Sequence, residues 1–170
     1  MMCGITGTPG TGKSAIGEEL AKRGHTVVHL TTTVAPYVTG MDEERDAQII
    51  DVDRWADEFV PVDGFVEGHL AQYLPCDKIV VLRCRPDVLK QRLAMRKYRK
   101  EKIRENAEAE ALDVCLIETV EDFDPDQILE VDTTERKVAE CADIIGGFRK
   151  GTVLAGFGTI DWSRFLGVGL

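Results

Sequence analysis

Residues 7–14 form a glycine-rich stretch, Gly-Thr-Pro-Gly-Thr-Gly-Lys-Ser, which has the spacing G-x-x-x-x-G-K-[ST] of a P-loop. A short apolar run at residues 2–6 precedes it, and a helical pattern from Ser14 to about Arg23 follows it. In this strand–loop–helix setting, successive backbone N–H groups form a concave anion site at a helix N-terminus. The stretch therefore predicts a buried central strand with the loop at its carboxyl end.

Two side chains of this stretch are expected to act on a nucleotide. Lys13 would reach the β- and γ-phosphates, and the Ser14 hydroxyl would ligate Mg²⁺. The alternative is a glycine-rich turn that binds nothing. Three glycines, a lysine and a serine in register, between a strand and a helix, argue against that alternative.

Composition excludes several classes of protein. The chain has 170 residues, a length typical of one domain, and a net charge of -9, which argues against general binding to nucleic acid or anionic membranes. The five cysteines are dispersed without a C-x-x-C pair, a pattern of reduced intracellular thiols. No apolar run approaches the roughly 18 residues of a membrane span, and the P-loop arrives too early for a signal peptide. A cytoplasmic location is the expectation.

Apolar runs and helical patterns alternate along the chain, which predicts an α/β fold with a five-stranded parallel sheet flanked by helices. Strands are expected at residues 2–6, 25–30, 78–84 and 128–132, and in the stretch that ends at Glu67. Helices are expected at about residues 14–23, 53–59, 100–118 and 135–145, and from Pro86 onward. The nearly continuous apolar run at 78–84 is typical of a strand buried on both faces.

An acidic residue after a buried strand marks a second candidate site. P-loop enzymes place such a residue near Mg²⁺, and Glu67 has this position, with His69 two residues on and projecting to the same side of an extended chain. The plainer alternatives are an exposed strand-end carboxylate and a core or helix-start histidine. His29, at the end of another expected strand, could be catalytic, but a structural role is favoured.

Four further segments leave alternatives open. Residues 31–53 break the strand–helix rhythm and are either an acceptor-binding insertion or a solvated loop with a short helix. Residues 90–104 hold eight Lys or Arg and one acid, Glu101, which suits a phosphate-clamping lid, a nucleic-acid patch or a solvated helix face. Thr133 and Thr134 either contact a nucleobase or cap a helix. The aromatic residues of the tail, 146–170, predict docking on the domain, with a short capped helix at 161–166; a partner surface is the alternative.

Several of these motifs together resemble one family. They are the P-loop, Asp51-Val52-Asp53-Arg54, Glu67-Gly68-His69, Val80-Val81-Leu82-Arg83, Arg96-Lys97-Tyr98, and the block Glu-Asn-Ala-Glu-Ala-Glu at residues 105–110. The chain resembles archaeal members of the adenylate kinase isoenzyme six family, whose eukaryotic relatives are also small-subunit ribosome assembly factors. The resemblance covers about residues 2–145.

The resemblance implies a P-loop nucleoside monophosphate kinase fold over residues 1–170, with an acceptor-binding insertion at about 28–51 and a basic lid at about 95–105. It implies Mg²⁺-dependent transfer of the γ-phosphate of ATP to AMP, with an accompanying ATPase activity. One alternative is an ATP-hydrolysing factor of ribosome biogenesis and rRNA processing that binds a small-subunit ribosomal protein. Another is a kinase of a different small acceptor.

Residue roles follow from the resemblance by position. Nucleotide-binding positions are Gly10, Thr11, Gly12, Lys13, Ser14, Ala15 and Arg96. Catalytic positions are Lys13, Arg96, Glu67 and His69, and metal-binding positions are Ser14 and Glu67.

The chain departs from the family pattern at three places. Glu67 replaces an aspartate, so the carboxylate reaches one methylene further, and Lys97 replaces a glycine at the hinge of the lid. An arginine of the acceptor insertion is replaced by Ala35, for which Arg45 or Arg54 could substitute.

Overall fold

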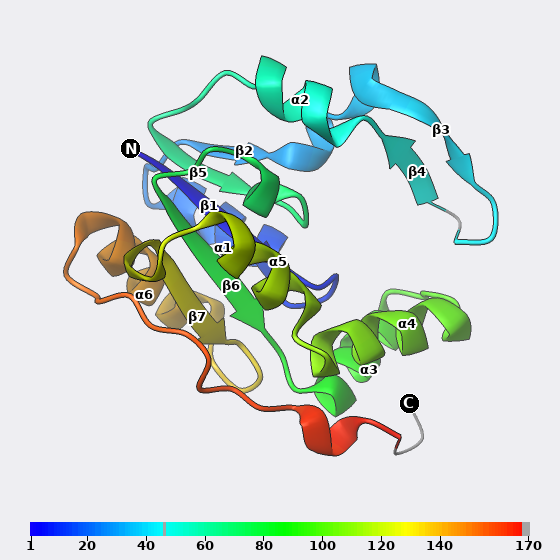
Figure 1. The fold of residues 1–170 in the computed structure, drawn as a ribbon. Coiled ribbons are helices and arrows are strands. Elements are labelled where there is room, and N and C mark those ends of the chain that lie inside the picture. Colours follow the sequence, from blue (N-terminus) through cyan, green and yellow to red (C-terminus); the bar gives the residue numbers. More distant parts are fainter. Residues whose placement is uncertain (46, 168–170) are drawn as a thin grey trace.

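The computed structural model describes residues 1–45 and 47–167 and is built around a five-stranded sheet in the order β2-β5-β1-β6-β7 (Figure 1). All neighbouring strands in it are parallel. Its strands are β1 (Met2–Gly7), β2 (Val27–His29), β5 (Gly64–Glu67), β6 (Lys78–Arg83) and β7 (Ile128–Asp132). The predicted α/β fold with a five-stranded parallel sheet is confirmed.

Helices cover both faces of this sheet (Figure 1). They are α1 (Lys13–Lys22), α2 (Val52–Glu58), α3 (Pro86–Met95), α4 (Lys100–Ala111), α5 (Val114–Asp122) and α6 (Val138–Lys150). Single 3₁₀ turns lie at Leu30–Thr32, Ala35–Tyr37, Ala71–Tyr73, Pro125–Gln127 and Ser163–Phe165. Among the described residues, no helix is long and apolar enough to cross a membrane.

The core has two layers, one on each face of the sheet. Strand β6 contributes to both, because its successive side chains point to opposite faces: Ile79 packs in one cluster and Val80 in the other. The first cluster includes Trp55 of α2, and the second includes residues of α1 and α6. The prediction that residues 78–84 form a strand buried on both faces is therefore confirmed.

The predicted helix at 100–118 is wrong, because the chain forms two helices there. It turns at Leu112 and Asp113 between α4 and α5, and Asp113 has a φ of 58°. Aspartate is one of the few residues that adopt this left-handed conformation routinely. In this position its carboxylate forms an ion pair with the buried Arg83, which fixes the break.

Residues 31–53 form neither a plain loop nor a segment with a short α-helix. They contain an antiparallel hairpin of β3 (Val38–Asp42) and β4 (Ala47–Ile50), which is separate from the central sheet. In Figure 1 this hairpin extends beyond the sheet on the same side as α3 and α4. Helix α2 then starts with Asp51 rather than Asp53 as its N-cap, since the Asp51 carboxylate accepts from the Arg54 N–H.

The last helix begins later than expected. α6 starts at Val138 with Lys137 as N-cap, so Thr133 and Thr134 do not cap it. The tail then runs past β7, and Gly156 exchanges two backbone hydrogen bonds with it: Glu130 N–H to Gly156 O at 2.8 Å and Gly156 N–H to Ile128 O at 3.0 Å. The expected helix at 161–166 is a single 3₁₀ turn near α3 and α4 (Figure 1).

Candidate functional site

The loop between β1 and α1 depends on glycines at two positions for different reasons. Gly10 has a φ of 91°, and a Cβ there would lie 2.9 Å from Leu89 Cδ1 of α3. Gly12, the N-cap of α1, has a φ of 106° but open space around it. Both backbone conformations strain any other residue. The loop is thus held with its backbone ahead of the α1 N-terminus, the arrangement that binds phosphate.

Lys13 folds back over this loop. Its Nζ donates to the carbonyl oxygens of Gly7 at 2.6 Å and Thr8 at 3.0 Å. Removal from water lowers the pKa of Lys13 to about 8, although the carboxylates of Glu67 and Glu110 act in the opposite direction. An anion arriving at the loop would stabilise the charged form of this ammonium.

A pocket of about 260 Å³ lies beside the loop, and it receives two guanidinium groups, one from Arg92 of α3 and one from Arg96, which caps the end of that helix. Its lining includes loop residues 10–12, Ala15, Arg92, Arg96 and Thr133. Arg92 is fastened to the segment after β7, since it donates to the Thr133 carbonyl at 2.7 Å. The structure therefore brings Gly10, Thr11, Gly12, Ala15 and Arg96 to one cavity, with Lys13 and Ser14 in the adjoining turn.

Thr133 connects three segments around this pocket. Its hydroxyl lies 2.7 Å from the Thr11 carbonyl and 2.9 Å from the Arg83 carbonyl, and the residue is buried. It therefore ties the P-loop to the carboxyl ends of β6 and β7. The sequence predicted a nucleobase contact or a helix cap for Thr133 and not this role, because contacts between distant segments leave no local signal.

Glu67 ends β5, beside Ile5 of β1, and is buried. Its carboxylate pairs with Nδ1 of His29, which ends the neighbouring strand β2 in register with Glu67. His29 was interpreted as structural, and the sequence reasoning missed this contact because strand order is not visible in the sequence. The pair makes His29 a candidate positioning residue for the Glu67 carboxylate.

His69 is exposed two residues after Glu67. The pKa of His69 lies below its ordinary value, first because nearby protein displaces water from the ring and second because of the charges of Lys13 and Lys102. The ring is therefore neutral at physiological pH and can accept or donate a hydrogen bond.

The donors suit a hard cation. Ser14 offers a hydroxyl and Glu67 a carboxylate, and Mg²⁺ prefers oxygen ligands. The described residues contain no cluster of three or more His, Cys, Asp or Glu able to hold a metal. This set fits Mg²⁺, which keeps several waters and takes ligands from phosphates rather than from an all-protein cage.

The hairpin reaches the start of α4. Lys102 Nζ donates to the Arg45 carbonyl at 3.3 Å, so a cation of α4 faces the insertion. Arg54 is held elsewhere, in an ion pair with Glu58 at 2.9 Å and 5.6 Å from the centre of the Tyr37 ring. Lys102 is therefore a further candidate to replace the arginine missing at position 35, and the spacing of the insertion could not indicate it because Lys102 lies on another element.

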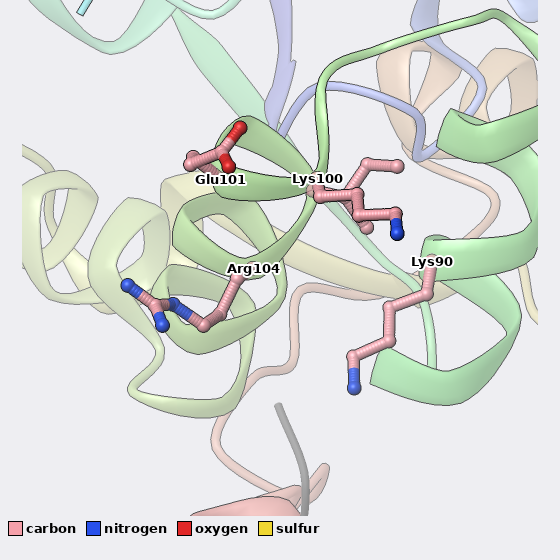
Figure 2. A pocket seen from close by; sticks show the side chains of 5 residues that line it. Lys90, Lys100, Glu101 and Arg104 are labelled. Atoms are coloured by element: carbon pink, nitrogen blue, oxygen red, sulfur yellow. The ribbon is translucent and has the colours of Figure 1, made fainter. Parts of the chain in front are cut away.

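The basic segment divides its charges between two faces. Arg92 and Arg96 line the pocket beside the P-loop, whereas a second pocket of about 330 Å³ opens between α3 and α4. Figure 2 shows Lys90 of α3 and Lys100, Glu101 and Arg104 of α4 around this second pocket. The basic segment therefore forms neither a single solvated helix face nor a single phosphate-clamping surface.

A buried ion cluster joins α4 to the sheet. Arg83, at the end of β6, is 1% exposed and donates from Nε to Glu110 Oε1 at 2.8 Å. It also pairs with Asp113 and Glu130. Burial alone would lower the pKa of Arg83, but Glu110 and Asp113 raise it above its ordinary value. Arg83 thus stays charged while holding three carboxylates.

The fold and the loop geometry define a P-loop protein with the α/β architecture of a small kinase. Among solved structures, a gluconokinase from Sinorhizobium meliloti 1021 superposes with a TM-score of 0.54 at 19% identity, covering 89% of this chain and 93% of that one. An uncharacterized protein from Eubacterium ventriosum has the same TM-score at 12% identity, covering 88% and 98%. At these identities the likeness concerns the fold.

Sequence comparison then gives the family. Residues 3–113 match the family described as AAA domain. A protein of Archaeoglobus fulgidus named "Putative adenylate kinase" is 40% identical over 166 residues, covering 95% of this chain and 92% of the relative. A relative of the same name from Natronomonas pharaonis is 38% identical, covering 98% and 100%. The chain belongs to this archaeal family, which confirms the resemblance seen in the motifs.

Proposed function

We propose that this protein transfers the γ-phosphate of ATP to a nucleoside monophosphate, with AMP as the preferred acceptor. The observation that carries the proposal is the pocket beside the P-loop, which residues 10–12 line together with two arginines, Arg92 and Arg96. The names of the archaeal relatives support adenylate as the acceptor. The same site supports hydrolysis of ATP when no acceptor is bound.

The residues of this chain would act by positioning and by charge. Lys13 would exchange the Gly7 and Thr8 carbonyls for phosphate oxygens, and Arg96 would neutralise charge on the transferred group. Ser14 and Glu67 would hold Mg²⁺, which supplies further neutralisation of the phosphates. His29 would keep the Glu67 carboxylate in place. No covalent intermediate with the protein is needed.

The hairpin and α4 form the acceptor side in this proposal. The hairpin occupies most of the insertion at 28–51. Lys102 contacts it, and the charge of Lys102 is one of the causes that lower the pKa of His69. Residues 95–105, which contain Arg96 and the start of α4, act as the lid. Closing this segment would exclude water that otherwise hydrolyses ATP.

A coupled assay of ATP consumption across a panel of acceptors tests the proposal. The panel holds AMP, the other nucleoside monophosphates, nucleosides, small sugars and no acceptor. We expect ADP formation fastest with AMP, loss of most turnover in Lys13→Met, and wild-type turnover in Lys22→Met, an exposed lysine at the end of the same helix. Full turnover in Lys13→Met would refute the assigned site, and equal rates with and without AMP would refute the acceptor.

Binding to a small-subunit ribosomal protein, with a role in ribosome assembly and rRNA processing, stays a prediction, as does the cytoplasmic location. Slow hydrolysis of ATP without an acceptor, together with a nucleotide-dependent complex with a purified small-subunit protein, would favour the assembly role over a metabolic one.

Lys102→Met in the same panel tests whether Lys102 belongs to the acceptor side of the site. We expect a higher KM for AMP and an unchanged KM for ATP.

A further inference from the structure

We propose that Glu110 is a positioning residue that couples the P-loop to helix α4 through a hydrogen bond from Thr8. The inference builds on the proposed phosphoryl transfer, because it assigns a route by which occupation of the nucleotide loop reaches the lid and the acceptor side.

The contact itself is short and buried. The Thr8 hydroxyl donates to Glu110 Oε2 at 2.6 Å across 102 positions of sequence, and each residue is 2% exposed. The other carboxylate oxygen, Oε1, accepts from Arg83 Nε at 2.8 Å and from the Cys84 N–H at 3.0 Å. With both oxygens engaged, Glu110 has little freedom to move independently of the P-loop or of β6. Hydrogen bonds to ionised groups are the stronger ones in proteins.

Thr8 also contacts Lys13. Its carbonyl accepts from Lys13 Nζ at 3.0 Å, and from the N–H and the hydroxyl of Thr11 at 3.2 and 2.8 Å. When Lys13 turns to a phosphate, Thr8 loses this partner at its carbonyl while its hydroxyl still holds Glu110. A single residue therefore joins the phosphate-sensing lysine to the carboxylate of α4.

Helix α4 carries the coupling across the site. Glu110 lies near its carboxyl end, and Lys102 near its start touches the Arg45 carbonyl of the hairpin. Glu110 follows Lys102 by eight positions, which corresponds to about 12 Å along the helix axis. A shift at Glu110 is thus delivered to the start of α4, where the lid and the acceptor-binding hairpin meet. If Glu110 only held the fold together, an apolar residue could fill its buried position without the desolvation cost of a carboxylate.

The test compares two buried threonines. Thr8→Val removes the hydroxyl that donates to Glu110. Thr6→Val is the matched control, since the Thr6 hydroxyl donates at the same 2.6 Å to Gln72 Oε1 and Thr6 is also buried. Thr8→Ser keeps the hydroxyl and serves as the rescue. Each variant is measured by hydrogen exchange of residues 100–111 with and without ATP, by steady-state kinetics and by thermal unfolding.

We expect ATP to slow exchange in residues 100–111 of the wild type, Thr6→Val and Thr8→Ser, and to have little effect there in Thr8→Val. We also expect kcat to fall roughly tenfold in Thr8→Val alone, as for the loss of a hydrogen bond to a charged group, with the KM for ATP changed less. Equal ATP-induced protection and equal kcat in Thr8→Val and Thr6→Val would overturn the coupling.

The two proposals fail in different ways. If the wild type binds ATP but phosphorylates no nucleoside monophosphate, the proposed reaction is wrong, and the exchange measurement still decides for or against the coupling. If AMP is phosphorylated and Thr8→Val behaves as Thr6→Val, only the coupling is wrong. A wild type that binds no ATP would refute both.

Discussion

Replacing Lys97 by glycine should stabilise the protein, which is unusual for removal of a side chain. Helix α3 ends with two hydrogen bonds, Tyr98 N–H to Leu93 O at 3.2 Å and Lys97 N–H to Ala94 O at 3.0 Å. These are the bonds of a Schellman motif, in which glycine usually occupies the position of Lys97. Lys97 has a φ of 60° there.

The magnitude follows from two opposing terms. A left-handed conformation costs a residue with a Cβ about 1–2 kcal/mol. Glycine loses about 0.5–1 kcal/mol more chain entropy on folding. The difference leaves a gain of about 0.5–1 kcal/mol, or about 1–4 °C in Tm for a chain of this size.

Thermal and urea unfolding measure this gain, and Lys97→Ala is the control. Alanine removes the same charge from the basic segment but keeps the Cβ, so it isolates the backbone effect from electrostatic repulsion. We expect Lys97→Gly to unfold at a higher temperature than both the wild type and Lys97→Ala. A glycine variant no more stable than the alanine variant would show that the left-handed residue is not strained.

Three further predictions concern charge and packing. A bound phosphate raises the pKa of Lys13 from about 8, so ATP binding above that pH takes up a proton. The affinity for ATP should therefore fall as the pH rises from about 8 to 9, as measured by calorimetry in buffers of different ionisation enthalpy. An affinity that does not change over this range would contradict the prediction. Arg83→Met leaves buried carboxylates unpaired and should lower the free energy of unfolding by about 3–5 kcal/mol in urea; a loss under about 1 kcal/mol would contradict this. Gly146→Ala should stabilise α6 by about 0.5–1 kcal/mol, whereas Gly147→Ala should destabilise it because the new Cβ would lie 2.8 Å from Val153 Cγ2; Tm changes of the same sign would refute the pair.

The sheet could be predicted from the sequence because its signals are local. The apolar run at 78–84 and the glycine spacing of the P-loop each specify their own conformation without reference to the rest of the chain. The helix break at Asp113 could not be predicted in this way. Helical spacing continues across the turn, and the ion pair that Asp113 forms there with Arg83, 30 residues away in sequence, leaves no local signal.

The same distinction applies to the candidate site. The sequence located the P-loop and the positions of Glu67 and His69, since motifs give residue types at fixed spacing. It did not give the pairing of His29 with Glu67, or of Thr8 with Glu110, because both depend on which strands and helices become neighbours. Partners contributed by other elements are the part of a site that a single sequence conceals.

The path of the tail has a consequence for how the protein behaves at high concentration. β7 lies at one end of the order β2-β5-β1-β6-β7, so within residues 1–45 and 47–167 no further strand of the sheet lies on one side of its backbone. Gly156 takes up an N–H and a carbonyl on that side. Unpaired strand edges recruit other molecules into extended sheets. We therefore expect the tail to shield this edge, and a chain cut at residue 150 to show more light scattering at high concentration than the full chain; equal scattering would contradict this.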